Sequence, residues 1–183
     1  MKELSLNVLD IAMNSVKAKA TLINIHIFED DELLSLEIID NGCGMTADFL
    51  QSVIDPFCTT RTTRKVGLGI PLLKLAAEQT GGEVKILSRH ESEYPKDHGT
   101  SVLATFYKKH IDFTPIGDIT STVTTLIQGS PDIDFEFLHN SSVFEVSLDT
   151  REVREVLGPE IPLSEPEILS WIVDNLSEQY NNI

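Results

Sequence analysis

Asp40-Asn41-Gly42-Cys43-Gly44-Met45 directly follows a strongly apolar strand pattern over residues 33–39. A carboxylate at the end of a buried strand costs several kcal/mol unless hydrogen-bond donors reach it. The exocyclic amine of an adenine ring is one such donor. Gly42 and Gly44 would let the backbone pass close to a ligand where a side chain would clash. Because Asp-Asn-Gly is also common in simple turns, the run alone leaves a turn and a binding site open.

The size and composition of the chain favour a packed domain. Its 183 residues, of which 41% are hydrophobic, suit one medium domain or one domain with a small appendage. We find neither a charged, apolar leader nor an apolar run long enough for a bilayer, so we expect a cytoplasmic protein. Cys43 and Cys58 have neither metal-type nor disulfide-type spacing, so we expect two free thiols.

The net charge of -15 is unevenly distributed. Residues 1–109 carry 15 acidic and 12 basic side chains, a net charge of -3, whereas residues 110–183 carry 14 acidic and 2 basic side chains, a net charge of -12. Because a surface this acidic repels phosphate backbones and anionic lipids, we expect neither a nucleic acid nor a membrane as partner. It favours a basic protein partner, with a solvated face kept for solubility as the alternative.

The first predicted helix covers residues 4–20, where apolar residues recur every three or four positions. Asp10 and Asn14 are four positions apart, so they project from the same face, beside the buried stripe. A carboxylate and a carboxamide stacked in this way would hold a water molecule next to a divalent cation. Mg²⁺ prefers few protein oxygens together with waters and phosphate oxygens. Two merely exposed polar residues are the alternative.

A hairpin and a short helix are predicted next. Residues 22–28 and 33–39 are apolar and β-branched and are separated by a charged turn, which indicates two antiparallel strands. The second strand brings Asp40 to its end. Residues 46–53 then favour a short helix with Thr46 as its cap.

A cationic loop precedes the next helix. Thr and Arg residues fill positions 59–64, Lys65 follows, and Gly67-Leu68-Gly69 leads into a helical pattern over residues 70–79. Glycines before a helix N-terminus leave unpaired amides pointing at an anion. We therefore expect phosphate binding at this joint, with a plain connection between loop and helix as the alternative.

Two more strands are predicted over residues 83–89 and 100–107. Gly99 and Thr100 open the second of them, where a small residue and a hydroxyl could face the same pocket as Asp40; a turn glycine is the simpler explanation. Among the histidines, His98 and His139 are expected in loops and none on a helix face, which argues against self-phosphorylation.

A small α+β unit is predicted after residue 110, where the composition changes. Residues 118–128 are compatible with a helix or a strand. The spacing of their apolar residues favours a helix, whereas their Thr-rich composition favours a strand. Residues 133–138 and 143–148 predict a second hairpin, and residues 150–157 and 165–176 predict two helices.

Four short motifs resemble, in their order and spacing, the GHKL superfamily of ATPases, which includes DNA gyrase B, the chaperone Hsp90, the mismatch-repair protein MutL and the histidine kinases. The motifs are Asp10-Ile11-Ala12-Met13-Asn14-Ser15, Asp40-Asn41-Gly42-Cys43-Gly44-Met45, the lid from Asp55-Pro56-Phe57 to Gly67-Leu68-Gly69, and Gly99-Thr100. The resemblance covers residues 1–110 and leaves residues 111–183 as a small acidic C-terminal domain of unknown role.

The resemblance implies an α+β fold, a two-layer α/β sandwich of the Bergerat type, with a mixed, mainly antiparallel sheet and helices on one face. It also implies ATP and Mg²⁺ as ligands, with Asn14 on the metal and Asp40 on the adenine amine. The positions that it assigns to ATP binding are Asn14, Asp40, Gly42, Gly44, Met45, Thr59, Thr60, Arg64, Lys65, Gly67, Leu68, Gly69 and Thr100.

One departure from the resemblance concerns catalysis. Hydrolysing relatives have a glutamate as general base four positions before the magnesium-binding asparagine, where this chain has Asp10. A carboxylate withdrawn by roughly an ångström can cost about 100-fold in rate. We therefore expect a slow ATPase or nucleotide-controlled switch, with Asp10 as the catalytic candidate. The alternatives are a protein kinase that acts on a partner in trans and an interaction module with a vestigial site. A protein partner of the acidic region is expected, and a homodimer is left open.

Overall fold

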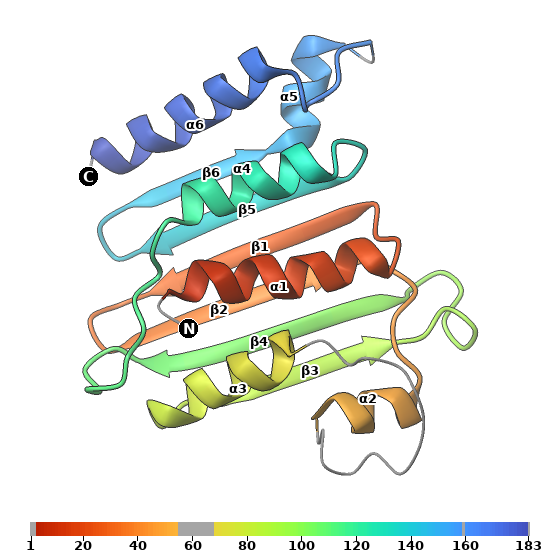
Figure 1. Cartoon of the computed structure of the whole chain (residues 1–183), viewed down its shortest axis with the longest axis vertical. Helices are drawn as coiled ribbons and strands as arrows, with labels where there is room; N and C mark the ends of the chain where they lie inside the picture. The colour runs from red at the N-terminus through yellow and green to blue at the C-terminus, as the bar shows by residue number, and fades with distance from the viewer. Residues whose placement is uncertain (1–2, 55–67, 159, 183) are drawn as a thin grey trace.

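The computed structural model describes residues 3–54, 68–158 and 160–182, which form a six-stranded sheet with helices packed on it (Figure 1). In chain order the elements are α1 (Leu4–Lys17), β1 (Leu22–Glu29), β2 (Leu33–Asp40), α2 (Ala47–Ile54), α3 (Gly69–Gln79), β3 (Val84–Arg89), β4 (Gly99–Tyr107), α4 (Ile119–Gly129), β5 (Asp134–Ser141), β6 (Glu145–Asp149), α5 (Thr150–Leu157) and α6 (Pro166–Asn181). The strand order is β3-β4-β2-β1-β5-β6. The β1–β5 pair is parallel, and the other described pairs are antiparallel.

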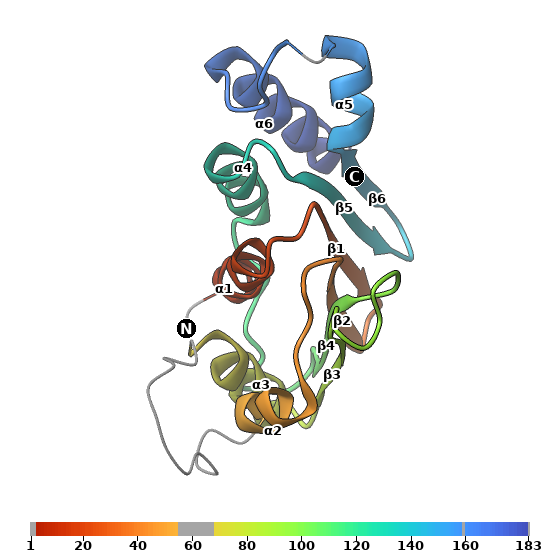
Figure 2. The same cartoon turned by 90° about the vertical axis from the view of Figure 1, so that its right-hand side faces the viewer.

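The helices α1, α3 and α4 form a layer against one face of the sheet, which confirms the predicted two-layer α+β sandwich (Figure 2). Within this layer α1 contacts both α3 and α4, and α4 contacts α6. Alternate residues of β1, namely Ile23, Ile25 and Ile27, are fully buried. Because each such side chain contributes about 1.5–3 kcal/mol on burial, this strand is held at the centre of the core.

The elements predicted for the first half of the chain are present. The hairpin of β1 and β2 is antiparallel, with Ile23 opposite Asp40. The hydroxyl of Thr46 accepts a hydrogen bond of 3.4 Å from the Phe49 amide, as expected of a cap of α2. The first helix ends three residues earlier than predicted, at Lys17, because Lys19 adopts a left-handed backbone with φ of 60°.

The Thr-rich segment whose pattern fitted both helix and strand forms the helix α4. Asp118 caps it, since its carboxylate accepts a hydrogen bond of 2.9 Å from the Ser121 amide, and this bond lowers the pKa of Asp118. Ile119, Val123 and Ile127 lie on one face of α4 and are buried. The cap and the spacing of apolar residues therefore outweigh the strand propensity of the threonines.

The residues after position 110 extend the sheet, because β5 pairs with β1 in parallel. β6 follows β5 as an antiparallel hairpin, as predicted. The prediction that His139 lies in a loop was wrong: β5 continues to Ser141, and His139 is buried within this strand. The domain boundary at residue 110 stays a prediction. None of the helices in the described ranges has the length and apolar character needed to cross a bilayer.

A polar cluster connects the C-terminal elements to the β1–β2 hairpin. Nδ1 of His139 lies 2.8 Å from the hydroxyl of Tyr180 on α6, and Nε2 lies 3.1 Å from the carboxylate of Glu29 on β1. Lys108 donates to the other oxygen of Glu29 at 2.6 Å. Burial lowers the pKa of His139, and the Glu29 carboxylate opposes this effect. Two groups from distant segments, Tyr180 and Glu29, therefore satisfy both nitrogens of the buried imidazole, and Lys108 pairs with Glu29.

Candidate functional site

Asp40 lies at the end of β2 beneath α1. Its Oδ2 accepts a hydrogen bond of 2.6 Å from the hydroxyl of Ser15, and its Oδ1 accepts one of 2.9 Å from the amide of Gly42. Each carboxylate oxygen has two lone pairs, so both oxygens retain capacity for another donor. The predicted carboxylate is therefore supplied with donors from the protein and is half-buried, yet still able to accept a hydrogen bond from a ligand.

A row of hydroxyls continues from Asp40 across the sheet. Thr100 on β4 is directly opposite Asp40 on β2, and Ser88 on β3 is directly opposite Thr100. The two hydroxyl oxygens are 2.8 Å apart, and Ser88 also accepts a hydrogen bond of 2.8 Å from the amide of Met45. The register thus places the predicted residues Asp40, Met45 and Thr100 at one end of the sheet.

These residues line a common cavity of about 560 Å³. Its walls include Ile39, Asp40, Met45, Leu50, Ser88 and Thr100. Apolar side chains would contact the flat faces of a ring while the carboxylate and hydroxyls bind its edge, a combination typical of small-molecule sites. The cavity walls also include Arg89, Glu93 and Tyr94 near the β3–β4 connection, so the cavity combines apolar, polar and charged groups.

The glycines between Asp40 and Met45 allow the close backbone approach. Gly44 has φ of 68°, and a Cβ at this position would lie 2.0 Å from the carbonyl oxygen of Arg89. A Cβ on Gly42 would lie 2.8 Å from Cβ of Ala18 on the segment after α1. Nδ1 of His98 is 2.6 Å from the carbonyl oxygen of Gly42, and since a carbonyl only accepts, Nδ1 carries the proton.

The other predicted side chains lie along α1 and at the start of α3. Asp10 and Asn14 are one turn apart on α1, where Asp10 is exposed and Asn14 is half-buried. A Cβ on Gly69 would lie 3.0 Å from Cβ of Asp10, so the N-terminus of α3 is next to Asp10. The preceding Leu68 is exposed. Asp10 and the amides at the start of α3 are thus brought together.

Several predicted phosphate-binding residues fall outside the described residues. They are Thr59, Thr60, Arg64, Lys65 and Gly67. Their assignment therefore stays a prediction, as does the free thiol of Cys58, whereas Cys43 has a free thiol.

Sequence reasoning missed three polar residues of the site: Ser15, Ser88 and His98. Ser88 had a signal, because the alternation of β3 places it on the same face as Val84 and Ile86, where an apolar residue is expected. Ser15 follows Asn14 directly, but helix periodicity does not show that its hydroxyl meets a strand end. His98 lies in a loop, where no periodic pattern places a side chain.

A family model described as "Histidine kinase-, DNA gyrase B-, and HSP90-like ATPase" matches residues 1–110. The chain belongs to this ATPase family. The matched range contains the carboxylate of Asp40, the row of hydroxyls and the start of α3.

Two curated proteins are similar in sequence to part of this chain. The sensor protein KdpD of Clostridium acetobutylicum is 30% identical over 94 residues, 49% of this chain and 10% of that protein. The signal transduction histidine-protein kinase AtoS of Escherichia coli is 29% identical over 89 residues, 48% of this chain and 14% of that protein. This chain therefore spans only a small part of either relative, 10% of the first and 14% of the second.

Two solved structures share the fold. The MutL ATPase domain of Aquifex aeolicus, complexed with ADP, matches with a TM-score of 0.56 and 16% identity over 86% of this chain and 69% of that chain. The N-terminal domain of a DNA repair protein matches with a TM-score of 0.53 and 18% identity over 87% of this chain and 58% of that chain. Because these shares exceed the range of the family match, the fold similarity extends into the residues after position 110.

Proposed function

We propose that this chain binds ATP together with Mg²⁺ and acts as a slow ATPase or a nucleotide-controlled regulatory switch. The observation that carries the proposal is the cavity in which Asp40, aligned by Ser15 and Gly42, lies beside the hydroxyls of Thr100 and Ser88. Membership of the ATPase family supports it.

In this proposal Asp40 accepts a hydrogen bond from the adenine amine. Thr100 binds an adjacent edge of the ring, and Met45 contacts its face. An Asp40 carboxylate that the protein has already oriented loses little freedom when the ring enters, which favours binding. Gly42 and Gly44 allow the loop after Asp40 to pack closely on the protein, because a Cβ at either position would collide with Ala18 or with the Arg89 carbonyl group.

The triphosphate would lie between α1 and the start of α3. Amides at Leu68 and Gly69 would donate to phosphate oxygens, and the helix dipole of α3 favours the negative charge. Asn14 would supply one oxygen to Mg²⁺, which neutralises phosphate charge when bound. We also assign Thr59, Thr60, Arg64, Lys65 and Gly67 to the phosphates, on the sequence pattern alone.

Asp10 would act as the general base on the attacking water. Its position one turn before Asn14 and beside Gly69 supports this assignment. The shorter side chain holds the carboxylate further from the phosphate than a glutamate would, so we expect slow turnover.

The proposal also includes a cytoplasmic location and a protein partner for the acidic C-terminal region.

A second candidate is a protein kinase that transfers phosphate to a partner protein. It is favoured by the similarity of half of this chain to the sensor protein KdpD and the histidine-protein kinase AtoS. The transfer would move the terminal phosphoryl group of ATP to a side-chain oxygen or nitrogen of the partner, with ADP as the product.

One experiment separates these functions. The protein is incubated with ATP labelled at the γ-phosphate and Mg²⁺, alone and with a cell extract. Free labelled phosphate from the protein alone, lost in Asp10→Asn, supports the slow ATPase. Label transferred to a second protein supports the kinase. Failure to bind ATP at micromolar concentration contradicts both and leaves an interaction module.

A further inference from the structure

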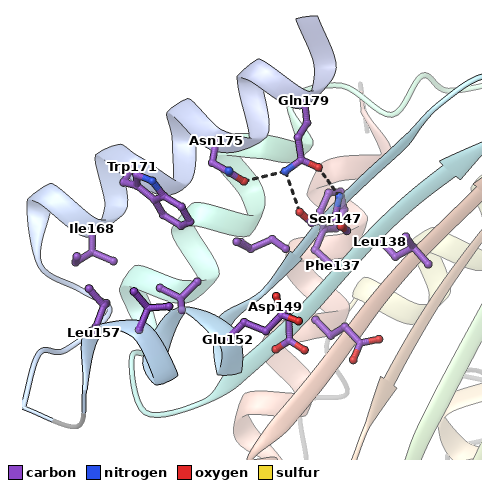
Figure 3. A pocket seen from close by; sticks show the side chains of 14 residues that line it. Phe137, Leu138, Ser147, Asp149, Glu152, Leu157, Ile168, Trp171, Asn175 and Gln179 are labelled. Atoms are coloured by element: carbon purple, nitrogen blue, oxygen red, sulfur yellow. Dashed lines mark hydrogen bonds between the residues drawn. The ribbon is translucent and has the colours of Figure 1, made fainter. Parts of the chain in front are cut away.

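An open groove of about 830 Å³ lies between α5 and α6, next to the edge strand β6 (Figure 3). It is distant from the Asp40 cavity, which lies at the end of β2, because β1 and β5 separate β2 from β6 in the sheet. Its apolar lining residues are Phe137 and Leu138 of β5, Leu148 of β6, Val153, Val156 and Leu157 of α5, and Ile168 and Trp171 of α6.

Two large apolar side chains of the groove are exposed to solvent. Val156 is 87% exposed and Trp171 is 50% exposed, and both line the groove. In Figure 3 the indole of Trp171 projects from α6 into the space between the two helices. Exposed valine and tryptophan side chains on facing helices form a surface that a second apolar surface would bury favourably.

The free edge of β6 is already occupied by α6. The side-chain amide of Gln179 accepts a hydrogen bond of 2.9 Å from the Ser147 amide and donates one of 3.0 Å to the Ser147 carbonyl (Figure 3). Nε2 of Gln179 also donates a hydrogen bond of 2.8 Å to Oδ1 of Asn175. These bonds satisfy the central residue of the edge, so a partner strand could not add to β6 without displacing them. The groove therefore suits a helix better than an extended peptide.

Carboxylates lie in the groove wall and beside the lining residues of α6. Glu152 lies in the groove wall, and on α6 Glu167, Asp174 and Glu178 are exposed and each adjoin a lining residue in the sequence. Of the two basic residues after position 110, Arg151 pairs with Asp149 and Glu136, and Arg154 pairs with Asp134. Among the described residues, Glu152 forms no ion pair, so the rim carries a net negative charge.

We propose that the α5–α6 groove binds a cationic amphipathic helix of a partner protein, with apolar residues at helical spacing and Lys or Arg on its flanks. Its apolar side chains would cover Val156 and Trp171, and its cations would face Glu152 and the carboxylates of α6. A second copy of this chain would bring the same negative charge to the groove. This inference rests on the proposal of a protein partner for the acidic region and is independent of ATP binding.

Trp171 makes the proposal directly measurable, because it is the single tryptophan of the chain. The probe is a synthetic tryptophan-free peptide of Leu and Lys, with Leu at helical spacing. We expect saturable binding with a blue shift of the Trp171 emission, and an affinity that falls as salt is added. A peptide with Glu in place of each Lys, and a scrambled peptide of the same composition, should bind at least about tenfold more weakly.

Matched variants locate the binding. Val156→Glu should weaken the Leu-Lys peptide about tenfold or more. Val143→Glu changes an equally apolar side chain, 79% exposed in the β5–β6 turn, and should bind as the wild type does. Glu152→Lys should weaken binding and reduce its salt dependence, whereas Glu91→Lys, in the loop after β3, should do neither.

Three results would overturn the groove proposal. They are equal binding by Val156→Glu and Val143→Glu, equal affinity for the Lys and Glu peptides, and a wild-type dimer in sedimentation that Val156→Glu dissociates, which would assign the groove to a second copy. ATP affinity is measured in the same samples. If the groove test fails and the protein binds ATP, only the groove proposal is refuted. If the protein binds the peptide as predicted but not ATP, only the nucleotide proposal is refuted.

Discussion

The hydroxyl of Ser15 on α1 donates a hydrogen bond of 2.6 Å to Oδ2 of Asp40 at the end of β2. The two residues are 25 positions apart in the sequence, and this bond joins the helix that carries Asp10 and Asn14 to the carboxylate proposed to bind adenine. The nucleotide base and its metal would therefore be held by adjoining parts of one structure.

Loss of the Ser15 hydroxyl should weaken ATP binding moderately. Ser15→Ala removes a hydrogen bond to the charged Asp40 carboxylate, and such bonds are worth about 1.5–3 kcal/mol. Because this bond is present before ATP binds, we expect only part of that free energy, about 0.5–1.5 kcal/mol, to be lost from binding. We expect ATP affinity to fall by about 2- to 10-fold in isothermal titration calorimetry. Ser170→Ala, on the exposed side of α6, should bind as the wild type does; equal affinities for both variants would show that Ser15 does not orient Asp40.

A methyl group at Gly44 should destabilise the fold and the site. In Gly44→Ala the new Cβ would meet the Arg89 carbonyl at a backbone conformation with φ of 68°, so the loop must move. We expect a loss of at least about 1–2 kcal/mol in urea unfolding. Gly129→Ala is the matched control, because its Cβ would meet nothing within 4 Å. A Gly44→Ala variant as stable as Gly129→Ala would refute the observed loop geometry.

Lengthening Asp10 should accelerate hydrolysis. Asp10→Glu moves the carboxylate outward by roughly an ångström, a displacement that can be worth about 100-fold in rate. Since Asp10 is exposed, the additional methylene has room. Phosphate release should therefore rise in Asp10→Glu and be lost in Asp10→Asn, with similar ATP affinities. Turnover that is the same in all three proteins would remove Asp10 from the reaction.

The His139 cluster should make stability depend on pH. Burial lowers the pKa of folded His139 below its unfolded value of about 6.5, so the unfolded chain takes up this proton first as the pH falls. The stability that neutral His139 contributes is therefore fully present above the unfolded pKa. It decreases as the pH falls from that value toward the lower folded pKa.

Urea unfolding at about pH 7.5 and 5.5 tests this effect, with the lower value beneath the unfolded pKa. Between the higher and the lower pH, the free energy of unfolding should fall less in His139→Gln than in the wild type. This holds whatever the stability of the variant at the higher pH. His110→Gln, in the exposed turn after β4, should keep the wild-type difference. An undiminished difference in His139→Gln would show that another group causes the pH dependence.

Local patterns predicted most of the fold, because alternation and helical spacing report which face of each element is buried. The hairpin that ends at Asp40 and the helix with Asp10 and Asn14 needed only neighbouring residues. The parallel pairing of β5 with β1 was beyond such reasoning, since it joins Phe137 to Ile25 across more than half of the chain. His139 was misplaced for the same reason, because its hydrogen-bond partners Glu29 and Tyr180 are distant in sequence.

Part of the site was likewise predictable. Asp40, Gly44 and Thr100 occur in motifs whose residue types imply their chemistry, and the register places Thr100 opposite Asp40. Ser15 and Ser88 are ordinary serines whose importance arises from the packing of α1 and β3 around that carboxylate. Tertiary contacts, which single-sequence patterns do not encode, bring these hydroxyls to the candidate site.

The most direct test of ATP binding at this site compares two carboxylates of the same strand. Asp40 faces α1, whereas Glu37 lies on the opposite face of β2, where Ser101 donates to it at 2.9 Å. Titration calorimetry with ATP and Mg²⁺ should give more than about tenfold weaker binding for Asp40→Asn, because an amide would then face the adenine amine. Glu37→Gln should bind as the wild type does. Equal ATP affinity of Asp40→Asn and the wild type would contradict the proposed site.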